Sequence, residues 1–144
     1  MPRKIKLIID SDLENIPLVG MTINKLCSLT SFSDQETFQI ELCAVEAVTN
    51  SIKHAYGYNS VYQVEIVFAL SSKELTLDVY DTGTPLEKGL LEKRSMETLG
   101  HNTADPDNIP DGGRGLAIIQ TIMDSVVYKS EKGKNCFTMK KKLA

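Results

Sequence analysis

A glycine-rich turn that leads into a helix is the candidate anion site of this sequence. The turn reads DGGRGL from Asp111 to Leu116 and includes Gly113, Arg114 and Gly115. Unpaired backbone N–H groups and the helix dipole both favour phosphate at such a place. Glycines before a helix also serve as plain turns, so the motif alone leaves both interpretations open. The turn is neither a P-loop, since no Gly-Lys-Ser or Gly-Lys-Thr follows, nor a dinucleotide fingerprint, since no strand leads straight into it.

Asp81, at the end of a predicted strand, is a candidate for binding a hydrogen-bond donor of a ligand. By the two-residue period of a strand, it shares a face with Leu75, Leu77 and Val79, so its carboxylate points toward an apolar layer. A buried carboxylate is costly unless a donor satisfies it. The alternative is that Asp81 caps the turn before Gly83.

Glu46, Asn50 and His54 are spaced by four residues in an otherwise apolar helical segment. The segment runs from Glu41 to Gly57 and reads ELCAVEAVTNSIKHAYG. At about 100° per residue, Glu46 and Asn50 fall opposite the apolar side, and His54 lies at the edge of the polar arc. The stripe is either the solvated face of an amphipathic helix or one wall of a polar site.

Alternating strand and helix patterns must position these residues. Pro17 is tolerated only in the first turn of a helix, which places a helix start near Asn15 as the capping residue, and Ser33 with Glu36 forms a capping box for the next helix. The predicted elements are a strand over 5–9, helices over about 15–30 and 33–57, a hairpin of strands within 61–70 and 74–83, a helix over about 116–124, and strands over 125–131 and 135–143.

The segment over 82–113 is predicted to be a long loop with a short helix near 90–99. A compact domain rarely keeps ~30 irregular residues without a functional reason, and a lid over a ligand is the usual one. His101, within this loop, is expected to be exposed.

Length and composition limit the classes of protein that fit. A chain of 144 residues with 42% hydrophobic content suits one globular domain. Its net charge of −3 gives no basic field for nucleic acid, and no apolar run approaches the ~20 residues of a membrane span. The N-terminus shows no signal-peptide pattern, so a cytoplasmic location is expected. Cys27, Cys43 and Cys136 are expected to be reduced core residues.

The order of the three features is more specific than any one of them. The pattern E-x-x-x-N-x-x-x-H-A-Y on a helix, then D-x-G at a strand end, then a long loop and G-x-G-L opening a helix, resembles the GHKL (Bergerat-fold) ATPase superfamily. Within it, the sequence is similar to the anti-sigma factor serine/threonine kinases. The resemblance covers nearly the whole chain and implies a single histidine-kinase-like ATPase domain over 1–144.

The resemblance implies an α/β two-layer sandwich, with a mixed, mainly antiparallel sheet and helices on one face. ATP would lie between helices and sheet under a lid over 84–112. Asn50 would complete the coordination of Mg²⁺, and Glu46 would be the catalytic general base. Asp81 would accept a hydrogen bond from the adenine amino group, and Gly83 would allow its close approach.

The resemblance also assigns the glycine turn and its helix to the phosphates. Gly113, Gly115 and the following amides, beginning with Leu116, would cradle them, and Arg114 would pair with phosphate or a partner protein. A solvated surface arginine is equally compatible with the sequence. His54 is more consistent with a structural or lid-contacting hydrogen bonder than with a catalyst.

The last strand departs from the superfamily pattern. A Gly-Thr pair usually begins this strand, with the threonine beside the adenine-binding aspartate, whereas Asn135 or Cys136 stands near that place here. Alternation sets Asn135 on the face of Phe137 and Met139, so its amide could substitute for the threonine. Nucleotide affinity or base selectivity is expected to depend on this difference.

The implied activity is transfer of the ATP γ-phosphoryl group to a serine or threonine of an anti-sigma factor antagonist, a STAS-type protein. The same family logic implies a sigma factor as second partner and leaves a homodimer open, since relatives often pair. Neither nucleic acid nor membrane is an expected direct partner. The alternative is a non-catalytic switch module that binds nucleotide and regulates a partner such as a phosphatase. A histidine kinase catalytic domain is disfavoured, because no helix with a phosphoacceptor histidine precedes the first strand.

Overall fold

The structure, a computed structural model, describes residues 2–87 and 113–143 and forms two layers. One layer is a five-stranded sheet in the order β1-β2-β3-β5-β4. Its strands are β1 (Arg3–Asp10), β2 (Gln63–Leu70), β3 (Glu74–Asp81), β4 (Ser125–Glu131) and β5 (Lys134–Lys142). Every pairing among these described strands is antiparallel, where a mixed, mainly antiparallel sheet was expected.

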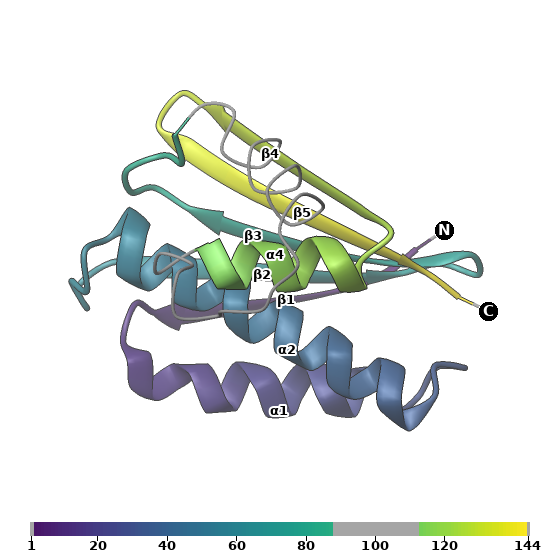
Figure 1. Ribbon diagram of the computed structural model, residues 1–144. Helices are drawn as coiled ribbons and strands as arrows, with labels where there is room; N and C mark the ends of the chain where they lie inside the picture. Colours follow the sequence, from purple (N-terminus) through teal and green to yellow (C-terminus); the bar gives the residue numbers. More distant parts are fainter. Residues whose placement is uncertain (1, 88–112, 144) are drawn as a thin grey trace.

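The helices cover one face of this sheet (Figure 1). They are η1 (Leu13–Asn15), α1 (Ile16–Cys27), α2 (Asp34–Asn50), the π-helix η2 (Ser51–Ala55) and α4 (Gly113–Ile122). The helix α2 packs between α1 and α4 and contacts both. The predicted two-layer sandwich with helices on one face is therefore confirmed. The helix expected near 90–99 lies outside the described residues.

The core forms where the two-residue alternation of the strands meets the helices. In β3 the inward residues Leu75, Leu77 and Val79 are at most 1% exposed, and the residues between them are half-buried. From the helices, Ile40 and Val48 of α2 are fully buried against this layer. Because apolar burial is the main stabilising term of folding, this shared layer holds the helices on the sheet.

The start of α1 differs in detail from the prediction. Pro17 lies in the first turn, as its missing N–H requires, but Asn15 makes no side-chain capping bond. Its amide donates instead to the Asp10 carbonyl at 3.0 Å. Asp12 is the residue that caps, since its carboxylate accepts from the Glu14 N–H at 2.9 Å and so begins η1. The prediction of an Asn15 cap was wrong because a neighbouring carbonyl takes its side chain.

The second helix begins as predicted and ends differently. Ser33 Oγ accepts from the Glu36 N–H at 3.1 Å, and the Glu36 carboxylate accepts from the Ser33 N–H at 3.0 Å, which confirms the capping box. After Asn50 the helix widens into a π turn, in which the Tyr56 N–H donates to the Ser51 carbonyl. Gly57 follows with φ of +57°, a value that glycine adopts without strain.

Two of the three cysteines lie in the core, and one does not. Cys27 and Cys43 are buried and free, and burial raises the pKa of each thiol to about 12. Cys136 is half-buried on the opposite face of the sheet, where its sulfur lies 3.4 Å from the Thr138 hydroxyl. The prediction of a core position was wrong for Cys136, because its place on β5 alternates with the inward Asn135 and Phe137.

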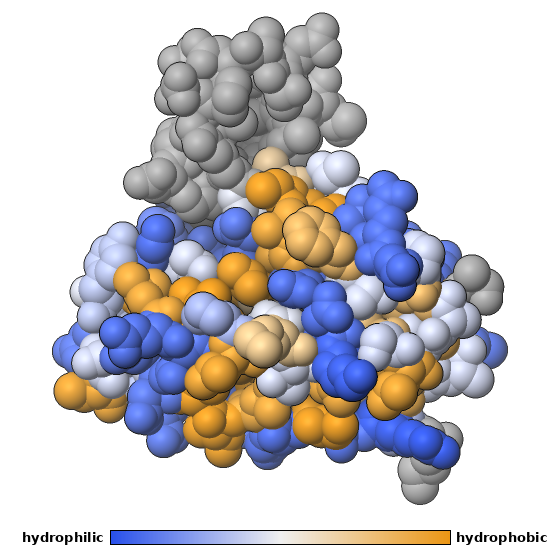
Figure 2. Space-filling view, turned by 90° about the horizontal axis from the view of Figure 1, so that it is seen from below, coloured by the Kyte–Doolittle hydropathy of each residue, from blue (hydrophilic) through white to orange (hydrophobic). Residues whose placement is uncertain are grey.

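The outer surface of the helical layer carries exposed apolar side chains. Figure 2 shows the molecule from the side of α1, with orange hydrophobic residues lying between blue hydrophilic ones. Leu18 and Met21 of α1 are 60% and 69% exposed, and Phe38 of α2 is 63% exposed. Within residues 2–87 and 113–143, no helix combines the length and apolar character needed to cross a bilayer.

Candidate functional site

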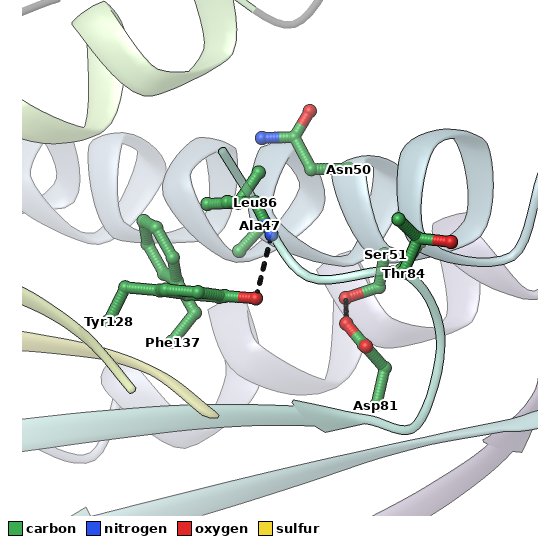
Figure 3. A pocket seen from close by; sticks show the side chains of 9 residues that line it. Ala47, Asn50, Ser51, Asp81, Thr84, Leu86, Tyr128 and Phe137 are labelled. Carbon is green, nitrogen blue, oxygen red and sulfur yellow. Dashed lines mark hydrogen bonds between the residues drawn. The ribbon is translucent and has the colours of Figure 1, made fainter. Parts of the chain in front are cut away.

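A pocket lies between α2 and the ends of β3, β4 and β5 (Figure 3). It encloses about 350 Å³, part of it open to solvent. Its lining residues are Ala47, Asn50, Ser51, Ala55, Asp81, Thr84, Leu86, Tyr128 and Phe137. The pocket therefore unites Asn50 and Asp81, two of the residues that the sequence singled out.

Asn50 lines the pocket from α2, and Glu46 lies one turn before it on the same helix. Both are half-buried, while Ala44 and Val48 on the opposite side of the helix are fully buried. The first turn of α4 approaches the stripe so closely that a Cβ on Gly115 would lie 2.6 Å from Glu46 Oε2 and 3.5 Å from Asn50 Nδ2. The stripe thus faces another element and is not a plain solvated helix face.

The predicted anion site coincides with the beginning of α4. The helix starts at Gly113, so the first four residues, Gly113 to Leu116, contribute the N–H groups that lack partners within the helix. Leu116 is 2% exposed and anchors this turn in the core. Because Gly115 has no side chain, these donors lie next to Glu46 and Asn50.

Asp81 ends β3 with its carboxylate turned inward, as predicted, and is 8% exposed. Oδ2 accepts from the Ser51 hydroxyl at 2.8 Å (Figure 3). Oδ1 accepts from the Gly83 N–H at 3.1 Å. The Asp81–Gly83 bond is the turn cap that the sequence left as an alternative. Asp81 therefore both caps the turn and points inward.

Gly83 permits a close backbone approach between the end of β3 and the π-helix. A Cβ at this position would lie 2.2 Å from the Ala55 carbonyl oxygen. The same oxygen accepts from the Thr84 N–H at 2.8 Å. The π turn therefore ties the chain after β3 to the end of the α2 segment, directly beside Asp81.

Tyr128 closes the pocket on the side of β4. Its hydroxyl oxygen accepts from the Leu86 N–H at 2.9 Å (Figure 3), and its ring lies 6.4 Å from that of Phe137. Burial raises the pKa of the Tyr128 phenol above its ordinary value of 10.0; the Leu86 hydrogen bond opposes this rise, and the Asp81 charge adds to it. The side chain thus stays a neutral hydroxyl near neutral pH.

Asn135 lies next to Asp81, as strand alternation predicted. The two residues are paired across β3 and β5, and Asn135 Nδ2 donates to Asp81 Oδ1 at 2.7 Å. Cys136, the other residue considered for this place, points to the opposite face. Asn135 is 2% exposed, so the amide is part of the interior of the site.

Sequence reasoning missed several residues of the site. Ser51 carried a signal only in that it follows Asn50, and its contact with Asp81 occurs where α2 gives way to the π-helix. Tyr128 and Ser130 could have been found from the pairing of the last two strands, because they lie opposite Phe137 and Asn135.

The remaining predicted residues are placed as follows. His54 is exposed, on the π-helix. Arg114 lies in the first turn of α4, and its side chain is outside the described part of the structure. His101 and most of the predicted lid, residues 88–112, also fall outside it, while residues 84–87 follow β3 without regular structure.

The donor set suits a nucleotide held with a divalent cation. Asn50 offers a neutral oxygen, the ligand type that Mg²⁺ accepts when phosphates and water complete its shell. Among the described residues, no cluster of three or more His, Cys, Asp or Glu side chains could hold a metal ion. A methyl group at Gly115 would lie 3.5 Å from Asn50 Nδ2, so its absence leaves the α4 amides beside the Asn50 side chain.

Comparison with known proteins agrees with this arrangement. Residues 9–141 match the model of the histidine kinase-like ATPase domain, and the chain belongs to that family. An anti-sigma F factor of Clostridium acetobutylicum is 32% identical over all of this chain and 96% of its own length. A serine-protein kinase RsbW of Listeria monocytogenes is 28% identical over 92% of this chain and 83% of its own length.

Two solved structures share the fold at low sequence identity. One is the SiaB-SiaC complex from Pseudomonas aeruginosa, with a TM-score of 0.59 and 12% identity over 96% of this chain and 89% of the other. The other is the catalytic domain of the histidine kinase ThkA, with a TM-score of 0.56 and 14% identity over 99% of this chain and 96% of the other. Both likenesses concern the fold alone.

Proposed function

We propose that this protein is an ATP-dependent serine-protein kinase that also acts as an anti-sigma factor. It transfers the γ-phosphoryl group of ATP to a serine or threonine of a STAS-type anti-sigma factor antagonist, and it sequesters a sigma factor until the unphosphorylated antagonist displaces it. The names of its relatives, anti-sigma F factor and serine-protein kinase RsbW, support both parts of the proposal. A sigma-factor partner places the protein in the cytoplasm.

The observation that carries the proposal is the contact between the α2 stripe and the first turn of α4. The Glu46 carboxylate, the Asn50 side-chain amide and helix N–H groups that lack partners within α4 meet there, beside Gly115. Phosphoryl transfer requires little covalent chemistry of a protein, and it depends on positioning and on neutralising phosphate charge. These three kinds of group provide a base, a metal ligand and an anion site on one side of the pocket.

Each residue has a separate task in the proposed reaction. Glu46 accepts the proton of the attacking hydroxyl as general base. Asn50 would hold Mg²⁺, which would neutralise charge on the phosphates when bound. Asp81 accepts a hydrogen bond from the adenine amino group, and Gly83 allows the chain to pass close to it.

The amides at the start of α4 hold the phosphates. They belong to Gly113, Arg114, Gly115 and Leu116, and the helix dipole adds to their attraction for anions. Arg114 belongs to this turn, and a guanidinium would pair with phosphate or with the partner protein.

The test is transfer of label from γ-labelled ATP, with Mg²⁺, to a candidate antagonist. We expect label on a partner serine or threonine, and we expect Glu46→Gln to lower the rate by about 10²- to 10⁴-fold while nucleotide still binds, because only the base is lost. Glu41→Gln is the matched control, since Glu41 lies on the same helix and accepts from Asn24 Nδ2 at 2.7 Å, which a glutamine oxygen can also do.

Two outcomes would contradict the kinase. If the Glu46→Gln variant transferred the phosphoryl group at the rate of the unaltered protein, Glu46 would not be the general base. Binding of ATP and antagonists without transfer would instead support the non-catalytic switch module.

A further inference from the structure

The carboxylate of Asp81 receives hydrogen bonds from three separate parts of the chain. Ser51 at the start of the π-helix donates to Oδ2 at 2.8 Å. Asn135 of β5 and the backbone N–H of Gly83 donate to Oδ1 at 2.7 and 3.1 Å. A carboxylate accepts about four hydrogen bonds, so three bound donors leave room for about one more.

Asn135 is itself held in one orientation. Its second N–H donates to the Gly83 carbonyl at 3.0 Å, and its Oδ1 accepts from the Ser130 hydroxyl at 2.6 Å. The opposite orientation of the amide would set its oxygen against a carboxylate and a carbonyl, so these partners determine which atom is nitrogen. A series of hydrogen bonds therefore runs from Ser130 through Asn135 to Asp81.

This arrangement determines how Asn135 can affect a ligand. Both of its N–H groups are used, and the residue is 2% exposed, so it has no donor left for a base in the pocket. Asn135 can therefore affect a ligand only through Asp81, whose carboxylate is also held by Ser51 and Gly83.

We infer that Asn135 is a positioning residue for base selection. It holds Asp81 Oδ1 so that the carboxylate accepts a single further donor, such as the amino group at position 6 of a purine. A carbonyl at the same position would set oxygen against oxygen. The site thus selects adenine over hypoxanthine through the Ser130–Asn135–Asp81 series. The inference rests on the proposed nucleotide site and adds a residue that acts on the base without touching it.

The test compares the binding of ATP and inosine triphosphate by calorimetry, at fixed Mg²⁺. The two nucleotides differ in the group at position 6. We expect the intact protein to prefer ATP by about 10- to 100-fold, as expected for a hydrogen bond to a charged acceptor. In Asn135→Val the preference should fall by about tenfold, because the carboxylate loses its buried anchor.

Matched variants separate positioning from general damage. Asn135→Thr has the shape of the valine variant with a hydroxyl in place of one methyl group, so it should recover most of the preference. Thr138→Val changes the same strand on its other face, where Thr138 donates to Asp78 at 2.5 Å, and should leave the preference unchanged. If Asn135 had only a structural role, its replacement would weaken the binding of ATP and of inosine triphosphate equally. The ratio of the two affinities would then stay constant.

Three results would overturn the inference. One is an unchanged preference in a folded Asn135→Val variant, and another is equal loss in the threonine and valine variants. If the valine variant fails to fold, Ser130→Ala removes only the outermost bond and should reduce the preference by about threefold, so an unchanged ratio there counts against the inference. A protein that binds neither nucleotide would instead overturn the nucleotide site itself.

Discussion

Gly83 and Gly115 both allow close contacts at the site, but a methyl group would meet different atoms at each. At Gly83 it would lie 2.2 Å from the Ala55 backbone carbonyl, which cannot move alone. At Gly115 it would lie 2.6 Å from Glu46 Oε2, the far end of a flexible side chain. The first glycine is therefore needed mainly for structure and the second mainly for chemistry.

We expect Gly83→Ala to lower the free energy of unfolding by about 1–3 kcal/mol, because the backbone must shift. Gly115→Ala should change it by less than about 1 kcal/mol, since alanine suits a helix, yet it should reduce phosphoryl transfer by displacing the Glu46 carboxylate. Denaturant unfolding and transfer assays on both variants measure this contrast. Equal losses of stability in the two variants, or full activity of Gly115→Ala, would contradict it.

For single residues of the site, the sequence predicted some contacts and missed others. The inward position of Asp81 and its neighbour Asn135 follow from the two-residue period of strands, which is a local rule. The Ser51–Asp81 bond joins residues 30 apart at a π turn. Regular helix geometry gives no such turn, so the sequence offered no sign of this partner.

Among the elements, α2 carries Glu46 and Asn50, and its N-terminus is fixed by the capping box. Replacing Ser33 by alanine should lower the free energy of unfolding by ~1 kcal/mol, because a helix donor loses its acceptor. The bond between the Ser33 hydroxyl and the Glu36 N–H joins neutral groups and is present at all pH values. The reciprocal bond, which the Glu36 carboxylate accepts from the Ser33 N–H, depends on ionisation of that carboxylate. Thermal or denaturant unfolding of Ser33→Ala measures the first part, and unfolding of Glu36→Gln against pH measures the second.

The pH dependence has a definite sign. The bonds from the Ser33 backbone and side chain lower the pKa of Glu36 below its ordinary value of 4.5 in the folded protein. A lowered pKa means that the carboxylate stabilises the fold above the unfolded value and loses this effect as pH falls through the folded value. The difference in stability between the intact protein and Glu36→Gln should therefore shrink below about pH 4.5. A difference that stays constant from pH 7 to pH 3 would contradict this origin.

Elements with strong local signals were predicted well, and their ends less so. Alternation predicted the hairpin of β2 and β3, and the capping box predicted the start of α2. The Asn15 cap failed because the Asp10 carbonyl, five residues away, competes for its amide. Such competition depends on how the chain folds back, and residue type alone does not reveal it.

For the whole molecule, the two-layer architecture brings three distant segments to one pocket. The pairing of β3 with β5 places Asp81 beside Asn135, 54 residues further along the chain. The two layers were predicted from the resemblance to the GHKL superfamily, and the apolar inward faces of the strands agree with them. The sequence could not predict the sheet order, since the β3–β5 pairing spans the long segment between them and no local pattern encodes it.

The central claim is that this pocket binds ATP with Mg²⁺, and thermal unfolding with and without the nucleotide tests it most directly. A ligand at ~100 times its Kd should add about 2.7 kcal/mol to the free energy of unfolding. Asp81→Ala should lose most of this gain, because the base loses its acceptor. Asp78→Ala, on the opposite face of β3, should keep it. No stabilisation of the intact protein by ATP and Mg²⁺, or an equal gain in Asp81→Ala, would contradict the nucleotide site on which the proposed kinase depends.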